Sequence, residues 1–162
     1  MLFRSVPGPE GLANETELRQ RFADKIPEPM RERFTQPRPI EYRPVDPRDW
    51  LGGEKREPAR QDIWFRLREP TVDDPAMHRA MLAYQSDSWL LGTCTLAHGV
   101  TWMTPGMMSA SLDHAVWLHG DFRVDDWLLY SCDSPWSGRG RGFNRGSIYT
   151  RDGRLVATCA QD

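Results

Sequence analysis

The clearest strand pattern in the chain lies in residues 61–69, which read QDIWFRLRE. Ile63, Phe65 and Leu67 alternate there with residues that are mostly polar. Because successive side chains of a β-strand point to opposite faces, this alternation predicts a strand that buries one face and leaves the other in contact with water.

A helix pattern follows in residues 73–94, DDPAMHRAMLAYQSDSWLLGTC. Asp73 or Asp74 can cap the helix, and Pro75 suits its first turn. A spacing of three and four predicts one buried helix face, made of Met77, Ala80, Met81, Tyr84 and Ser88.

Asp87 continues this face, although a buried carboxylate is costly unless it is hydrogen-bonded or paired. Two interpretations are open. Either the helix has ended and Asp87 is an ordinary solvated residue, or a cleft holds its carboxylate to bind a water or a proton.

Four later segments have the pattern of strands: residues 109–120, 126–136, 141–151 and 153–161. Asp152 and Gly153 form a strong signal for a hairpin between the last two. A strand, a long helix and then an antiparallel meander predict an α+β fold, in which one helix packs against one sheet.

Residues 1–59 differ in composition, because they hold nine of the thirteen prolines. Asn14 can cap one short helix over residues 15–23, which Pro27 and Pro29 would end. Residues 38–46 read as a short extended segment, and residues 50–61 as a loop. We therefore expect residues 1–59 to be a linker or N-terminal extension and residues 60–162 to be the folded domain.

The composition is that of an ordinary globular protein, with 39% hydrophobic and 27% charged residues. A formal net charge of −2 predicts no nucleic-acid partner, and no apolar run is long enough to cross a bilayer, so we expect no membrane partner. The four histidines show no metal-binding spacing, so no metal is expected.

The cysteines Cys94, Cys132 and Cys159 are widely spaced and odd in number, as is typical of reduced thiols. The first eleven residues lack the apolar core of a secretory signal. Both features predict a cytoplasmic protein.

Ser111, Asp113 and His114 have the three side-chain types of a hydrolytic triad. On a strand, however, Ser111 and Asp113 point to one face and His114 to the other, so they cannot act together. We expect His114 to be a packed strand histidine that bonds a neighbouring backbone group.

Gln161 ends the last strand, where Leu155, Ala157 and Cys159 share its face. An amide at the end of an apolar face is either an edge residue or a site residue, and the pattern does not decide between them.

Five segments together resemble a known family: LAYQSD, SLDHAVWLHGDFRVDDWLLYSCDSP, RGFNRGSIYTRDGRLVATCAQ, PGPEGLANETELRQRF and RPIEYRPVDP. The first three are similar to the C-terminal half of the acyl-CoA thioesterase II (TesB-like) family, and the last two to its inter-domain connection. The resemblance implies a hot-dog fold, a long helix wrapped by an antiparallel sheet, as one half of a double hot dog.

The same resemblance implies an activity, the hydrolysis of acyl-CoA thioesters to free fatty acid and coenzyme A, without a cofactor. The family holds the attacking water with an aspartate, a threonine or serine, and a glutamine. The matching residues here are Asp87, Ser111 and Gln161.

Arg139, Arg141 and Arg145 lie among glycines in residues 137–146. They form either a solvated turn in which one arginine supports the sheet, or a contact for the phosphates of coenzyme A.

Two other functions stay open. One is a non-catalytic acyl-CoA-binding or interaction module from a truncated thioesterase. The other is a hot-dog dehydratase or hydratase, which would need a converging Asp/His pair. Because the chain starts in what resembles the linker, without the family's first hot dog, we expect it to form a homo-oligomer or to associate with a second hot-dog domain.

Overall fold

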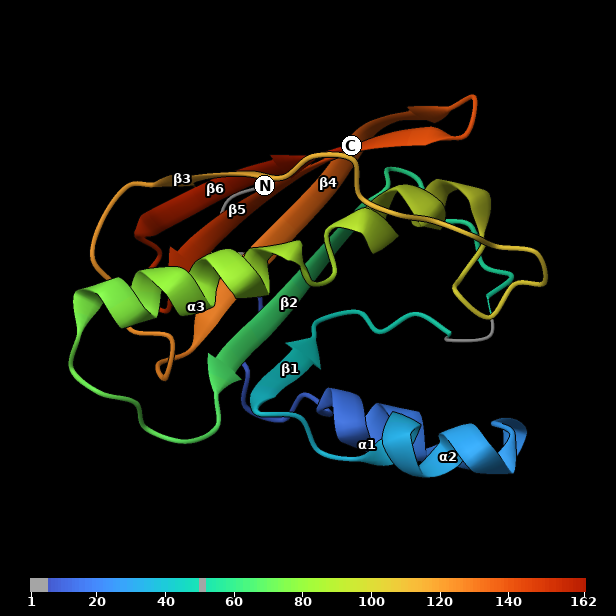
Figure 1. Cartoon of the computed structure of the whole chain (residues 1–162), viewed down its shortest axis with the longest axis horizontal. Coiled ribbons are helices and arrows are strands. Elements are labelled where there is room, and N and C mark those ends of the chain that lie inside the picture. The colour runs from blue at the N-terminus through green and yellow to red at the C-terminus, as the bar shows by residue number, and fades with distance from the viewer. Residues whose placement is uncertain (1–5, 50–51) are drawn as a thin grey trace.

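The computed structural model describes residues 6–49 and 52–162. Within these ranges, six strands form one antiparallel sheet in the order β1-β2-β4-β5-β6-β3. The strands are β1 (Ile40–Pro44), β2 (Arg60–Leu67), β3 (Ala115–Leu118), β4 (Leu128–Gly138), β5 (Arg141–Thr150) and β6 (Leu155–Gln161). Helix α3 (Pro75–Asp87) crosses one face of the sheet (Figure 1). The predicted α+β fold is thus confirmed, and β4, β5 and β6 form the predicted meander. The 3-10 helix η3 (Leu91–His98) follows α3, and β3 lies beside β6 instead of beside β4, so the prediction that it begins the meander was wrong.

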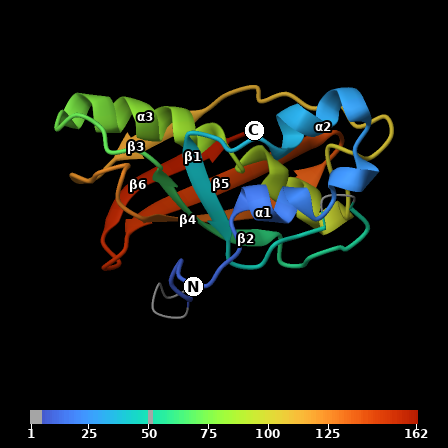
Figure 2. The same cartoon turned by 90° about the horizontal axis from the view of Figure 1, so that it is seen from below.

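The segment before the sheet contains more helix than predicted. Asn14 caps α1 (Glu15–Gln20) as expected, in a capping box with Glu17, but two further helical segments follow: η2 (Ala23–Lys25) and α2 (Glu28–Thr35). The prediction of one short helix was wrong because the prolines that were expected to end it instead flank the start of α2, where proline is well tolerated. Figure 2 shows α1 and α2 near β1.

The buried face of α3 differs from the predicted one. Tyr84 is 77% exposed and Met77 41% exposed, whereas the buried residues of the helix are His78, Leu82, Gln85 and Ser86. Only Leu82 among these is apolar, so a hydrophobic pattern could not identify the face. The polar members form hydrogen bonds inside; for example, His78 Nδ1 accepts from the backbone N–H of Val124.

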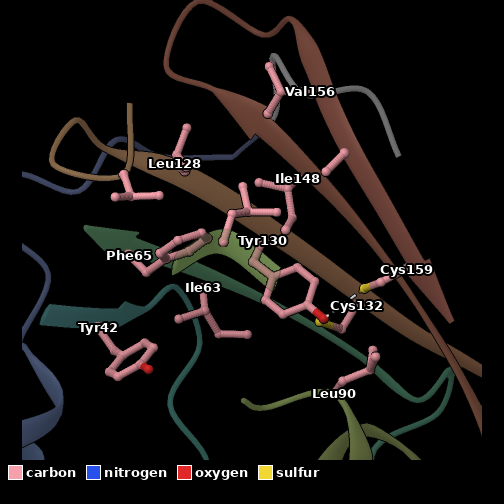
Figure 3. Close-up of a cluster of buried hydrophobic side chains, with 13 residues drawn as sticks. Tyr42, Ile63, Phe65, Leu90, Leu128, Tyr130, Cys132, Ile148, Val156 and Cys159 are labelled. Carbon is pink, nitrogen blue, oxygen red and sulfur yellow. Dashed lines mark hydrogen bonds between the residues drawn. The ribbon is translucent and has the colours of Figure 1, made fainter. Parts of the chain in front are cut away.

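A cluster of buried side chains lies between α3 and the sheet (Figure 3). Tyr130 is at its centre, and its hydroxyl donates to the carbonyl of Ser86 on α3 and lies 3.0 Å from Sγ of Cys159. Burial raises the pKa of Tyr130 well above its usual range, so the hydroxyl stays neutral. This contact joins the last turn of α3 to the middle of the sheet.

The hairpin between β5 and β6 is at the predicted position. Gly153 has a φ of 90°, and its N–H donates to the carbonyl of Thr150. A register shift follows between Ile148 and Tyr149 of β5. As a result, Tyr149 pairs with Leu155 but Ile148 pairs with Ala157, two residues further along β6. Leu155 is 39% exposed, whereas Ala157 is buried.

No helix in the described part of the chain combines the length and the apolar character needed to cross a membrane. The segment 50–61 was expected to be a loop; Trp50 and Leu51 lie outside the described residues, and β2 begins at Arg60.

Candidate active site

One glutamine amide joins the ends of three segments that are far apart in the sequence. Nε2 of Gln161 donates to Oδ1 of Asp87 and, at 2.7 Å, to Oγ of Ser111. Gln161 is the last residue of β6, Asp87 is the last residue of α3, and Ser111 lies shortly before β3. The structure therefore brings together the three residues that the family resemblance selected.

Burial differs sharply within this trio. Gln161 is fully buried, whereas Asp87 and Ser111 are exposed. The helix has thus ended at Asp87 and its carboxylate is solvated, as in the first of the two interpretations, yet the same carboxylate accepts a hydrogen bond from a buried amide. Oε1 of Gln161 is buried and accepts no hydrogen bond from the described residues.

Asp87 and Ser111 open into one cavity of about 330 Å³. Tyr42, Arg48 and Trp102 also line it. A second cavity, of about 540 Å³, adjoins the first and shares Leu91 and Trp102 with it. We call the first the trio cavity and the second the methionine cavity, because Met107 and Met108 line it.

Ser111 does not lie on a strand, which corrects the prediction for residues 109–120. Only Ala115–Leu118 forms β3. The residues before it are held by the chain end instead: the N–H of Leu112 donates to the carbonyl of Asp162, and the N–H of Asp162 donates to Oδ1 of Asp113. These contacts replace a regular ladder and direct Ser111 toward Gln161.

His114 also departs from its prediction. Its Nε2 lies 2.8 Å from Oγ of Ser86, a side chain of α3, rather than from a backbone group. Asp113 is occupied by the N–H of Asp162. Within the described ranges, no hydrogen bond joins Ser111, Asp113 and His114 to one another, so these adjacent residues do not form a triad.

The three arginines near the β4–β5 hairpin have different surroundings. Arg141 forms an ion pair with Asp162, and Arg145 forms one with Asp133. These carboxylates raise the pKa of each arginine. Arg139 lies at the tip of the hairpin with a φ of 53°, and the described residues provide no ion pair for it.

The methionine cavity is lined by Arg139 and Arg141 but not by Arg145. The structure thus brings two of the three predicted arginines to one cavity.

In the described ranges, no group of three or more His, Cys, Asp or Glu residues is arranged to hold a metal ion.

Sequence reasoning missed Arg48, which faces the trio cavity from the loop after β1. Its Nη1 donates to Oγ1 of Thr95 at 2.9 Å. The local sequence, Pro47-Arg48-Asp49, has no periodicity or motif that marks a site residue. Only the tertiary structure places Arg48 beside Asp87 and Ser111.

Comparison with known proteins identifies the family. A family model described as the acyl-CoA thioesterase C-terminal domain matches residues 9–162. The chain is 38% identical to human acyl-coenzyme A thioesterase 8 over an alignment that covers 98% of the chain and 51% of that protein. It spans about half the length of the curated relatives that it matches.

Solved structures agree with this result. An acyl-CoA thioesterase II, TesB2, from Mycobacterium marinum is 36% identical and matches with a TM-score of 0.71, over 97% of this chain and 52% of that one. A hot-dog protein of unknown function from Alicyclobacillus acidocaldarius matches with a TM-score of 0.65, over 99% of this chain and 53% of its own. Its identity of 16% speaks for the fold alone. The chain therefore has the hot-dog fold and belongs to the acyl-CoA thioesterase C-terminal domain family.

Proposed function

We propose that this domain hydrolyses acyl-CoA thioesters to free fatty acid and coenzyme A, with a water held by Asp87, Ser111 and Gln161. The observation that carries the proposal is the single buried amide that contacts both the carboxylate and the hydroxyl. The names of the relatives, which are acyl-CoA thioesterases, support the same substrate class.

The proposed reaction needs an oriented water more than a strong acid. Asp87 takes a proton from the water as its oxygen attacks the carbonyl carbon. The C–S bond then breaks and coenzyme A leaves as a thiolate, which takes up the proton. A thiol of pKa about 8.5 departs with little assistance.

Ser111 and Gln161 fix the direction of the water. The amide holds Asp87 and Ser111 in one arrangement before substrate binds, which lowers the entropic cost of reaching the reactive geometry. No covalent acyl-serine is required, in keeping with the separate partners of Asp113 and His114.

The trio can be tested by thiol release from several acyl-CoAs. Asp87→Asn and Gln161→Ala should each lower kcat by about 100-fold or more, because one removes the base and the other the group that orients it. Binding of acyl-CoA, measured by calorimetry, should be retained.

Asp113→Asn is the matched control. It removes a neighbouring negative charge but keeps the side-chain oxygen that accepts the N–H of Asp162 and so holds Ser111 in place. Turnover should therefore stay within about threefold of the unaltered chain. Unchanged turnover in both Asp87→Asn and Gln161→Ala would refute the assigned roles. Binding without any turnover by the unaltered chain would favour the acyl-CoA-binding module instead.

We propose Arg139, with Arg141, as a contact for the coenzyme A phosphates. Both line the methionine cavity, and Arg139 has no carboxylate partner among the described residues. Arg145 is the weaker member of the predicted set, since it is paired with Asp133 and lies outside that cavity.

We further propose that the protein is cytoplasmic, that residues 60–162 form its hot-dog domain, and that it pairs with a second hot dog. The three cysteines carry free thiols, which suits a reducing compartment. Residues 1–59 would be the connecting segment, although β1 within it pairs with β2. Exposed apolar side chains beside and on β3 support the pairing: Leu112, Trp117 and Leu118.

A further inference from the structure

Arg48 is a cation on the wall of the trio cavity that forms no ion pair with any residue described in the structure. Nη1 donates to Oγ1 of Thr95 at 2.9 Å and to the carbonyl of Gly92 at 3.4 Å, and both of these acceptors are neutral. No carboxylate lies within ion-pair distance of Arg48 in the part of the chain that the structure describes. Its Nε is buried and has no partner there.

Arg48 is half-buried, and its two hydrogen bonds to neutral acceptors offset only part of the lost solvation of the guanidinium. Loss of solvation is the main reason why the pKa of Arg48 falls below its usual range, and the positive charge of Arg56 adds to the effect. An arginine stays protonated even so, and a partly desolvated charge without a counter-charge is unfavourable. An anionic oxygen of a bound ligand would form charge-assisted hydrogen bonds with the guanidinium and so stabilise it.

The trio cavity, with a volume of about 330 Å³, leaves room for such a ligand. Gly92 packs against the guanidinium, and a Cβ there would lie 3.2 Å from Nη2 of Arg48. A side chain at position 92 would therefore press on the guanidinium. Asp87 and Arg48 line the same cavity without forming an ion pair with each other, so the guanidinium remains available to a ligand.

We propose that Arg48 is a catalytic residue that binds the oxyanion formed from the thioester carbonyl. The inference rests on the proposed hydrolysis. Water adds to the carbonyl carbon from the side of Asp87, and the electron pair of the C=O bond moves to the oxygen, which faces Arg48. When the C–S bond breaks, that oxygen becomes part of the product carboxylate, which Arg48 also contacts.

Arg48→Gln tests this role with two substrates, hexanoyl-CoA and hexanoyl-pantetheine. Both contain the same thioester, but the second has no phosphate. Loss of an oxyanion contact should lower kcat by about 100-fold on both, with KM within about threefold. Arg48→Lys keeps the charge without the fork of donors and should lose about tenfold, with an unchanged melting temperature.

Two control variants separate this role from simpler ones. Arg38→Gln removes an exposed arginine of the same cavity and should stay within about threefold of the unaltered chain. Arg56→Gln removes an arginine that donates to the carbonyls of Asp46 and Pro47 in the same loop but does not line the cavity, and should cost about threefold or less. If Arg56→Gln is as damaging as Arg48→Gln, the effect belongs to the position of the loop and the proposal is wrong.

Other results would also overturn it. A loss confined to hexanoyl-CoA would assign Arg48 to the phosphates, and an unchanged kcat would leave it without a catalytic role. Hexanoate binding, measured by calorimetry, gives a readout that needs no turnover. It should weaken at least about tenfold in Arg48→Gln, and absent or unaltered binding overturns the proposal. A chain that binds hexanoate through Arg48 but cleaves no thioester would contradict the hydrolysis alone.

Discussion

Gly146 shows how closely single residues are packed beneath the site. It lies in β5 between Cys132 and Cys159 of the neighbouring strands. A Cβ there would overlap Cε2 of Tyr130 and lie 2.7 Å from Sγ of Cys159. The Tyr130 ring occupies the space that a side chain at position 146 would need.

Gly146→Ala should therefore destabilise the fold by about 2 kcal/mol or more, because Tyr130 cannot move without breaking its contact with α3. Urea unfolding at neutral pH measures this loss. Ser147→Ala, the next position on the same strand, is the control and should cost less than about 1 kcal/mol. Equal effects of the two changes would contradict the packing argument.

Asp125 makes one part of the stability depend on pH. Hydrogen bonds from Arg123, with the N–H of Thr71, lower the pKa of Asp125 to about 2. A lowered pKa stabilises the folded state above the unfolded-state value of about 3.9, and this contribution is lost as the pH falls toward 2. Asp125→Asn should thus be less stable than the unaltered chain by about 1–2 kcal/mol at pH 7.

The difference should shrink when urea unfolding is repeated near pH 2.5. Asp126→Asn, at the next position in the chain, is a suitable control, since Asp126 is exposed. A difference between Asp125→Asn and the unaltered chain that is the same at both pH values would exclude this carboxylate as the cause.

How far the site could be predicted differs from residue to residue. The family resemblance selected Asp87, Ser111 and Gln161, and the structure places them around one amide. Periodicity alone placed Ser111 on a strand, which was wrong. Two hydrogen bonds to Asp162 hold residues 112 and 113 in an irregular segment, and a pattern of hydrophobic positions contains no information about such contacts. Arg48 could not be predicted, because its significance depends on its place in the trio cavity and on the lack of a carboxylate within ion-pair distance among the described residues.

Helix α3 carries Asp87 and begins at one of two adjacent aspartates. The sequence allowed either as the cap, and the structure selects Asp74, whose Oδ1 accepts from the N–H of Ala76. Asp74→Ala should cost about 1 kcal/mol of folding free energy. Asp73→Ala should cost less than about 0.5 kcal/mol, since its contact with Arg123 is an exposed ion pair.

Thermal unfolding of the two single variants provides the comparison. If Asp73→Ala is the more damaging change, the assignment of the cap is wrong. The position of α3 was predictable from these capping signals, whereas its buried face was not, because His78, Gln85 and Ser86 are polar and their partners come from other elements or from the backbone.

At the scale of the whole molecule, β3 is the edge that bears on assembly. It pairs with β6 on one side only, and Trp117 and Leu118 on it are 52% and 44% exposed. An edge strand with exposed apolar side chains favours association. We therefore expect a dimer in light scattering at micromolar concentration.

Trp117→Lys should shift this dimer toward monomer, because a charge would be buried in the contact. Tyr84→Lys, at an exposed aromatic position on α3, should leave it intact. If the unaltered chain is a monodisperse monomer, the proposed pairing with a second hot dog of the same kind is wrong.

From β2 onward, local alternation, the helix signals and one hairpin signal predicted β2, α3 and the meander of β4, β5 and β6. They did not predict the 3-10 helix η3 (Leu91–His98) or the position of β3 beside β6. The packing of residues from the first 59 positions into the core was not predictable. Tyr42 of β1 is buried in the core, and its hydroxyl bonds Oε1 of Gln85, 43 residues away. A short extended segment between prolines gives no indication of so distant a partner.

Because Gln161 is the last residue of β6, the geometry of the site depends on the pairing of that strand end. Its amide meets Asp87 and Ser111 only when β6 is paired to its last residue, with Asn144 of β5 opposite Gln161. Fraying of that strand end would scatter the trio while most of the sheet stayed folded. The rate of the proposed hydrolysis would then depend on the pairing of one strand end. On heating, this rate would fall at a lower temperature than the one at which the whole protein unfolds.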